Sequence, residues 1–227
     1  MRFGGMVGKF HEVTDWIIKF VYVNILWIIF SLLGLVLVGF FPATTAMFAV
    51  VRKWIMGQHD IPIFKSFLKA FQTEFKKANT LGYILVIIGA VLYMDSQIVQ
   101  QLTNPIWQLL QIPLFIALVI FALMALYAIP LFTHYHLSYL FIIRNAVLLV
   151  FKHPMMTILM GLSLYGLYVI TMSFPAVAVL FGGSITSFVI MRFSLILFEK
   201  NEQRQEEPVN EETAFTRNIY KLNESHK

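Results

Sequence analysis

The stretch FVYVNILWIIFSLLGLVLVGFFPATTAMFAVVRKW, residues 20–54, decides the fold class. It carries no charged residue before Arg52, and it is longer than the about 20 apolar residues that one membrane crossing needs. Pro42 interrupts the run and suits the first turn of a helix, because proline has a fixed φ and lacks a backbone N–H. The sequence therefore predicts a span from about residue 16 to residue 39, a turn at residues 39–42 and a second, shorter helix over residues 42–58.

The whole chain has the composition of a membrane protein. Its 227 residues are 59% hydrophobic and 13% charged, whereas about 25% of the residues of a soluble domain are charged. A core of this size cannot remove so much apolar surface from water, so lipid must surround much of it. We expect an all-α, polytopic transmembrane helical bundle over residues 1–198. The chain has no cysteine, which excludes disulfides, thiolate metal sites and cysteine nucleophiles.

The number of spans stays open between five and six. Four further apolar segments are long enough to cross, at residues 81–99, 112–133, 154–172 and 175–198. Residues 42–58 are short for a span, and they decide the count. The apolar sequence after residue 133 continues to Lys152, so this region must kink at Pro130, project, or bend along the interface.

The loop charges favour six spans. Residues 52–79, residues 134–153 and the C-terminal tail contain the basic loop residues, whereas residues 99–111 and 172–175 contain none. The positive-inside rule places the three basic segments in the cytoplasm, with both termini there if residues 42–58 cross. The five-span alternative puts the N-terminus outside. The polar, Glu-rich tail, residues 199–227, is predicted to be a disordered cytoplasmic segment.

An amphipathic helix is predicted in the first basic segment, DIPIFKSFLKAFQTEFKKANTLG, residues 60–82. At helical spacing its aromatic residues share one face and its lysines another. Such a helix lies in the headgroup plane against anionic lipid, or it docks on another protein. The candidate residues of this interfacial or partner-binding helix are Phe64, Lys65, Phe67, Lys69, Phe71, Phe75 and Lys76.

Three polar or charged residues inside the predicted spans are candidates for function. Asn24, beside Trp27, needs a hydrogen-bond partner in the apolar interior, and a neighbouring helix usually supplies one. Asp95 and Arg192 lie near opposite faces of the membrane and are not expected to form an ion pair. We interpret Asp95 as a group near the outer interface, with a cation or proton site as the alternative. Arg192 is expected to extend toward the cytoplasmic headgroups.

No motif predicts catalysis or a cofactor. His134 and His136 would lie on opposed faces of a helix, so they are poorly placed to share a metal ion. The sequence contains no phosphate-binding glycine loop, no helical zinc pair and no nucleophile elbow. We therefore expect no enzyme activity, no cofactor, no metal site and no binding of nucleic acid.

Several stretches taken in order resemble one family. They are NILW at residues 24–27, FPATTAMFAVVRKW at 41–54, FKSFLKAFQTEFKKAN at 64–79, HYHLSYLFIIRNAVLLVFKHPMMT at 134–157 and RFSLILFEKNE at 192–202. The set is similar to the YesL-like family of small integral membrane proteins of Gram-positive bacteria, over about residues 1–200. Candidate positions of function or packing are Asn24, Trp27, Asp95 and Arg192, with Pro42, Ala43 and Thr44 of the family signature and Arg144 of the fourth stretch.

The resemblance implies a bacterial plasma-membrane protein of unknown biochemical activity. Members of the family are often encoded beside carbohydrate-uptake genes, notably those of sugar-importing ABC transporters. The favoured hypothesis is an accessory or interaction subunit of such a transporter. The alternative is a stand-alone transporter or channel for small solutes, which helices interrupted at Pro42 and Pro130 would suit. Against this alternative, the intramembrane polar residues are few.

Overall fold

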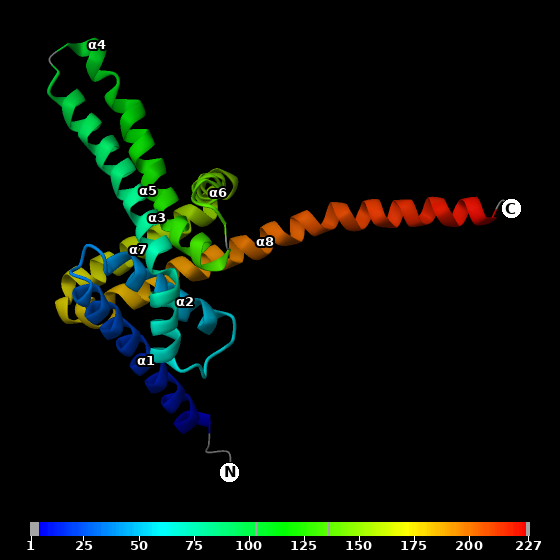
Figure 1. Cartoon of the computed structure of the whole chain (residues 1–227), viewed down its shortest axis with the longest axis horizontal. Helices are drawn as coiled ribbons and strands as arrows, with labels where there is room; N and C mark the ends of the chain where they lie inside the picture. The colour runs from blue at the N-terminus through cyan, green and yellow to red at the C-terminus, as the bar shows by residue number, and fades with distance from the viewer. Residues whose placement is uncertain (1–4, 103, 136, 226–227) are drawn as a thin grey trace.

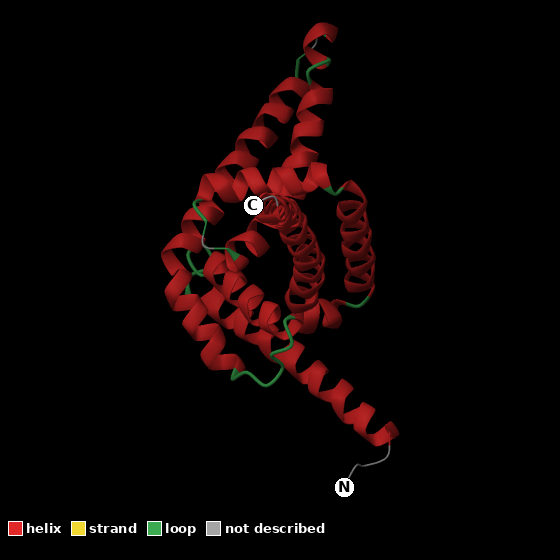
Figure 2. Cartoon of the chain, turned by 90° about the vertical axis from the view of Figure 1, so that its right-hand side faces the viewer, coloured by secondary structure: helices red, strands yellow, loops and turns green. Residues whose placement is uncertain are grey.

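The computed structural model describes residues 5–102, 104–135 and 137–225, and this part of the chain is built from helices (Figures 1 and 2). Apolar stretches of this length must satisfy their own backbone hydrogen bonds in lipid, which an α-helix does within one segment. The helices are, in chain order, α1 (Gly5–Leu33), α2 (Phe40–Ile55), α3 (Ile63–Gln100), α4 (Pro105–Gln108), α5 (Gln111–His134), α6 (Tyr139–Lys152), α7 (Pro154–Ser173) and α8 (Pro175–Ser225).

Five helical segments of the described chain are long and apolar enough to cross a membrane. They are His11–Leu33, Ile63–Gln100, Gln111–His134, Pro154–Ser173 and Pro175–Glu202. The predicted helical membrane bundle is thus confirmed. Helix α2 is not among the five, because its 16 residues extend only about 24 Å. By length, the described chain thus has five candidate spans rather than the preferred six.

The turn between α1 and α2 comes earlier than predicted. Helix α1 ends at Leu33, and residues 34–39 form the turn. A Cβ atom on Gly34 would lie 2.3 Å from the Cα atom of Gly39, so the two glycines permit a backbone approach that other residues would block. Pro42 is the third residue of α2 and thus lies in the first helical turn, as the sequence predicts.

Helix α2 is the buried centre of the fold. Ala43, Val50 and Val51 are fully buried, and Trp54 is 1% exposed. The helix runs back along α1, since the ring of Trp54 packs edge-on against Trp16 at 5.8 Å. It therefore reverses the chain although it is too short for a standard span, and residues 16–19 and 52–59 lie together.

The predicted amphipathic helix and the span after it form one continuous helix, α3, of 38 residues. Its aromatic face packs inside the protein: Phe67 is 0% exposed, and the ring of Phe30 on α1 lies 5.3 Å from Phe67 and 5.0 Å from Phe71. Both predictions for this face, contact with lipid at the headgroup plane and docking on another protein, are therefore wrong for Phe67. The reason is that α1 covers the apolar face, which sequence periodicity cannot reveal. Phe64 is 45% exposed and Phe75 packs against Phe71.

Two hairpins point away from one end of the molecule in different directions (Figure 1). Helices α3 and α5 form the first, with α4 at its tip, and α7 and α8 form the second. The apolar sequence of residues 112–152 breaks after His134, so α6 is a separate helix of 14 residues rather than an extension of α5. Helix α8 continues to Ser225, whereas the sequence predicts disorder after residue 198. The tail is rich in Glu, Lys, Arg and Gln, which have high helix propensity.

Candidate functional site

The amide of Asn24 joins α1 to α8. Its Nδ2 donates to the backbone carbonyl of Val179 at 2.7 Å, and its Oδ1 accepts from the backbone N–H of Ser184 at 3.0 Å. Asn24 is 1% exposed, so both bonds are shielded from water. Gly183 permits this approach, because a Cβ atom there would lie 2.9 Å from Oδ1 of Asn24. The predicted partner on a neighbouring helix is thus the backbone of α8.

Trp27 and the Pro-Ala-Thr segment form a second internal contact. The Nε1 of Trp27 donates to Oγ1 of Thr44 at 3.0 Å, and Thr44 in turn donates to the carbonyl of Phe40 at 2.7 Å. Pro42 and Ala43 are buried beside this contact in the first turns of α2. These residues fix the start of α2 against α1.

The three charged candidates lie far from this contact and from one another. Asp95 lines a shallow hollow near the tip of the α3–α5 hairpin, beside Ile98 and Pro113. Arg192 is exposed on α8. Arg144 is exposed on α6, where its guanidinium lies 4.9 Å from the ring centroid of Phe141. The structure therefore does not gather the predicted charged residues into one site.

The basic loop segments do meet at one end of the molecule. We call this the basic end and define it by the contacts of Arg52, His134, Tyr135, Asn201 and Glu202. The Nε of Arg52 donates to Nδ1 of His134 at 3.1 Å, and its Nη1 donates to the carbonyl of Thr133, also at 3.1 Å. The hydroxyl of Tyr135 donates to Oε1 of Glu202 at 2.6 Å. These bonds connect α2 with the end of α5, and the link after α5 with α8.

The second basic segment, residues 134–153, also contacts the tail at this end through His153. Its Nε2 lies 3.2 Å from Oδ1 of Asn201, and His153 is itself buried. The first basic segment also arrives there, since Glu74 and Lys77 of α3 line a hollow together with Tyr135 and Tyr139. These contacts agree with the charge count, which predicts one common side for residues 52–79, residues 134–153 and the start of the tail.

Burial changes the acidity of two groups at the basic end. It raises the pKa of the Tyr135 hydroxyl, and the hydrogen bond to Glu202 raises that pKa further. Tyr135 is therefore held as a neutral donor to the carboxylate. Burial lowers the pKa of Arg52. Its side chain compensates with two hydrogen bonds to the last turn of α5, so the end of α2 is fixed to the end of α5.

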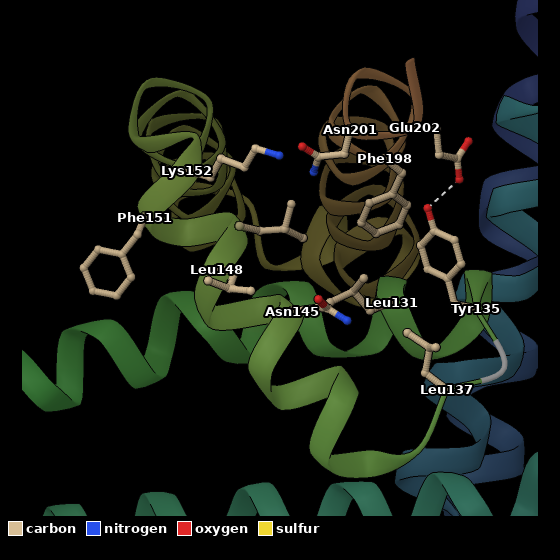
Figure 3. Close-up of a pocket in the computed structure, with 11 residues that line it drawn as sticks. Leu131, Tyr135, Leu137, Asn145, Leu148, Phe151, Lys152, Phe198, Asn201 and Glu202 are labelled. Atoms are coloured by element: carbon tan, nitrogen blue, oxygen red, sulfur yellow. Dashed lines mark hydrogen bonds between the residues drawn. The ribbon is translucent and has the colours of Figure 1, made fainter. Parts of the chain in front are cut away.

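A pocket of about 750 Å³ opens at the basic end, between α6 and α8 (Figure 3). This volume is within the range of about 300–1,000 Å³ that is typical of small-molecule sites. Five polar side chains line it: Tyr135, Asn145, Lys152, Asn201 and Glu202. The apolar lining residues are Leu131, Leu137, Leu148, Leu149, Phe151 and Phe198. Apolar and polar groups thus occupy different parts of one cavity.

Sequence reasoning missed this pocket. It did not assign Tyr135, Asn145, Asn201 or Glu202 to a site. The available signal was polar residues at the ends of apolar helices, in HYHLS after α5 and in NE after Phe198. A metal site is not supported in the described residues, where no group of three His, Asp or Glu side chains converges. His136 lies outside the described residues.

Comparison with known proteins places the chain in a family. A model described as protein of unknown function, DUF624, matches residues 20–96. Uncharacterized protein YesL of Bacillus subtilis (strain 168) is 34% identical over 84% of this chain and 90% of its own length. The chain belongs to the YesL-like family.

Two further members from the same organism are similar over most of the chain. Uncharacterized protein YteU is 32% identical over 92% of this chain and 93% of its own length. Uncharacterized protein YesV is 34% identical over 82% of this chain and 89% of its own length. No solved structure matches. The family identity thus agrees with the resemblance read from the sequence, and it assigns no activity.

Proposed function

We propose that this YesL-like protein is a non-enzymatic accessory subunit of carbohydrate uptake, which associates with a sugar-importing ABC transporter in the bacterial plasma membrane. The observation that carries the proposal is that intramembrane polar side chains form hydrogen bonds with other groups of the same chain. Asn24 uses both groups on the α8 backbone, and Trp27 is bonded to Thr44. Tyr127 of α5 is bonded to Thr157 of α7 at 3.0 Å and is fully buried. Polar groups consumed in helix contacts are not available to bind a passing solute.

This pairing argues against the stand-alone transporter. A sugar carries many hydroxyls, and its site must offer several hydrogen-bonding groups near the middle of the membrane. The described helices do carry polar side chains, among them Asn24, Thr44 and Tyr127. Each of these side chains is hydrogen-bonded to a neighbouring helix. The sugar-uptake context comes from the family resemblance, and the partner is a proposal on that basis.

The proposed partner-binding element is the part of α8 after Glu202. Figure 1 shows the end of α8 projecting far from the bundle. This part of α8 takes the place of the aromatic face of α3 as the proposed partner-binding surface, because Phe67 is buried. We further propose that the basic end faces the cytoplasm, because bacterial membrane proteins retain their basic loops there. The projecting helix then extends to the side on which the ATPase subunits of an importer lie.

The test compares full-length protein with a chain that ends after Glu202. This truncation keeps the Tyr135–Glu202 hydrogen bond, so the bundle should stay folded. Both are expressed with a tag in the native cell and purified in mild detergent, and the accompanying proteins are identified by mass spectrometry. A third chain carries residues 203–227 in shuffled order and controls for tail length and charge.

Permease or ATPase subunits should accompany the full-length protein and be lost from both altered chains. Recovery of the full-length protein without them would overturn the accessory role. So would solute uptake by the purified protein alone in vesicles, which would instead establish the transporter alternative.

A further inference from the structure

The pocket at the basic end has an unusual distribution of hydrogen-bonding partners. The Glu202 carboxylate accepts from Tyr135, and Oδ1 of Asn201 is held by His153. Lys152 and Asn145 also line the pocket, yet neither side chain bonds to another described residue. One carboxylate oxygen of Glu202 and the amide oxygen of Asn201 are thus paired within the protein, whereas the ammonium of Lys152 and the amide NH2 of Asn145 are free to donate. This arrangement favours an anionic ligand group.

The pocket opens toward an apolar surface. Helix α6 contributes both free donors, and the same helix exposes large apolar side chains on its outer side. Phe151 is 63% exposed and Leu148 is 53% exposed, and both line the pocket. Leu140, farther along α6, is 81% exposed. Apolar side chains exposed in this number beside a lysine are typical of a helix in the membrane interface.

The depth of the pocket fits the same location. Its lining includes Leu131 near the end of one candidate span and Phe198 near the end of another. Lys152 and Asn201 lie where these apolar segments give way to polar sequence. In Figure 3 the side chains of Lys152 and Asn201 are directed toward each other across the opening, and Leu131 lies deeper. The charged side chains Lys152 and Glu202 thus lie on one side of the cavity, and Leu131 lies on the other.

We infer that this pocket is a binding site for one anionic phospholipid. The phosphate accepts hydrogen bonds from Lys152 at the rim and from Asn145 below it, and the upper acyl chain lies on Leu148, Leu149 and Phe151. A soluble anion would satisfy the donors but leave the apolar lining uncovered. A lipid covers both, and it would also join α6 to the end of α8.

The test uses full-length protein, stripped of co-purifying lipid in detergent. Binding of phosphatidylglycerol and of phosphatidylcholine is compared by native mass spectrometry, and glycerol phosphate serves as a headgroup without chains. The variants are Lys152→Gln and Asn145→Leu. Lys200→Gln is the matched control, because Lys200 is exposed at the same end but does not line the pocket. Thermal unfolding without lipid checks that each variant folds.

Phosphatidylglycerol should bind tighter than phosphatidylcholine, and glycerol phosphate should not bind measurably. Lys152→Gln should weaken phosphatidylglycerol binding roughly fivefold, as expected for one cation at an anionic lipid surface, whereas Lys200→Gln should have little effect. Equal loss in both lysine variants would overturn the site and indicate general surface attraction. Equal binding of the two lipids, or binding of glycerol phosphate alone, would overturn it as well.

A second measurement does not depend on variants. A phosphatidylglycerol with a photoreactive group near the headgroup should label the unmodified protein within residues 145–152 or 198–202. Labelling confined to other segments would contradict the inference even if the variants proved unstable.

Discussion

The Oδ1 of Asn24 lies 3.0 Å from the backbone nitrogen of Ser184, and this bond joins the first helix of the chain to the last. Since Nδ2 of Asn24 also donates to Val179, one side chain holds two backbone groups of α8 about one turn apart. Substitution with leucine removes both bonds in a site that is closed to water. Asn24→Leu should destabilise the protein by about 1–2 kcal/mol, within the range measured for polar contacts between membrane helices.

The measurement for Asn24→Leu is thermal unfolding in detergent, followed by the loss of helical circular dichroism. Gln97→Leu is the matched control, because Gln97 is exposed on α3. The control should unfold at nearly the temperature of the unmodified protein. An unchanged unfolding temperature for Asn24→Leu would show that the contact with α8 contributes nothing to stability.

Gly82 allows α3 to pack against the start of α2. A Cβ atom at this position would lie 2.2 Å from Cγ of Phe41, so the ring or the helix would have to move. Gly82→Ala should therefore destabilise the protein by about 1–3 kcal/mol, as overpacking does. Gly161→Ala is the control, because no atom lies within 4 Å of a Cβ atom there. The control should be neutral or stabilising by up to about 1 kcal/mol, since alanine favours helix. Equal effects of the two changes, measured by the same thermal unfolding, would contradict this packing role.

The sequence allowed prediction of the helices but not of their mutual packing. Apolar length and the positions of Pro42, Pro154 and Pro175 were sufficient for most of the boundaries. The periodicity around Phe67 correctly predicts an apolar face. It does not say what covers that face, because lipid, a partner protein and Phe30 of α1 would all select the same residues.

The candidate site was less predictable for the same reason. Tyr135 and Glu202 are separated by 67 positions in the chain, and no local pattern connects them. The positive-inside rule gave the most useful prediction of this site, because it assigns whole segments to one side of the membrane and does not depend on their contacts. It assigned residues 52–79, 134–153 and the tail to one side. The bonds of Arg52 and His153 now bring these segments together.

Burial of Phe67 leads to a prediction that separates folding from partner binding. Phe67→Ser should cost about 3–5 kcal/mol, as large-to-small changes in a core do, and should lower the yield of folded protein. Phe64→Ser, at a side chain that is 45% exposed on the same helix, should cost less than half as much. Yield and monodispersity on size-exclusion chromatography are the measurements. A Phe67→Ser protein that is as stable as Phe64→Ser would show that this face is free, as a docking surface would require.

The absence of cysteine makes the orientation of the chain directly testable. Each single cysteine introduced is the only thiol in the protein, so labelling reports one position. Lys200→Cys places a thiol at the basic end, and Gln101→Cys places one near the tip of the α3–α5 hairpin; both positions are exposed. If the basic end faces the cytoplasm, a membrane-impermeant maleimide should label Gln101→Cys in intact cells after removal of the cell wall. It should label Lys200→Cys only after the membrane is broken. The reverse pattern would place the basic end outside, against the positive-inside rule, and would remove the cytoplasmic partner from the proposed function.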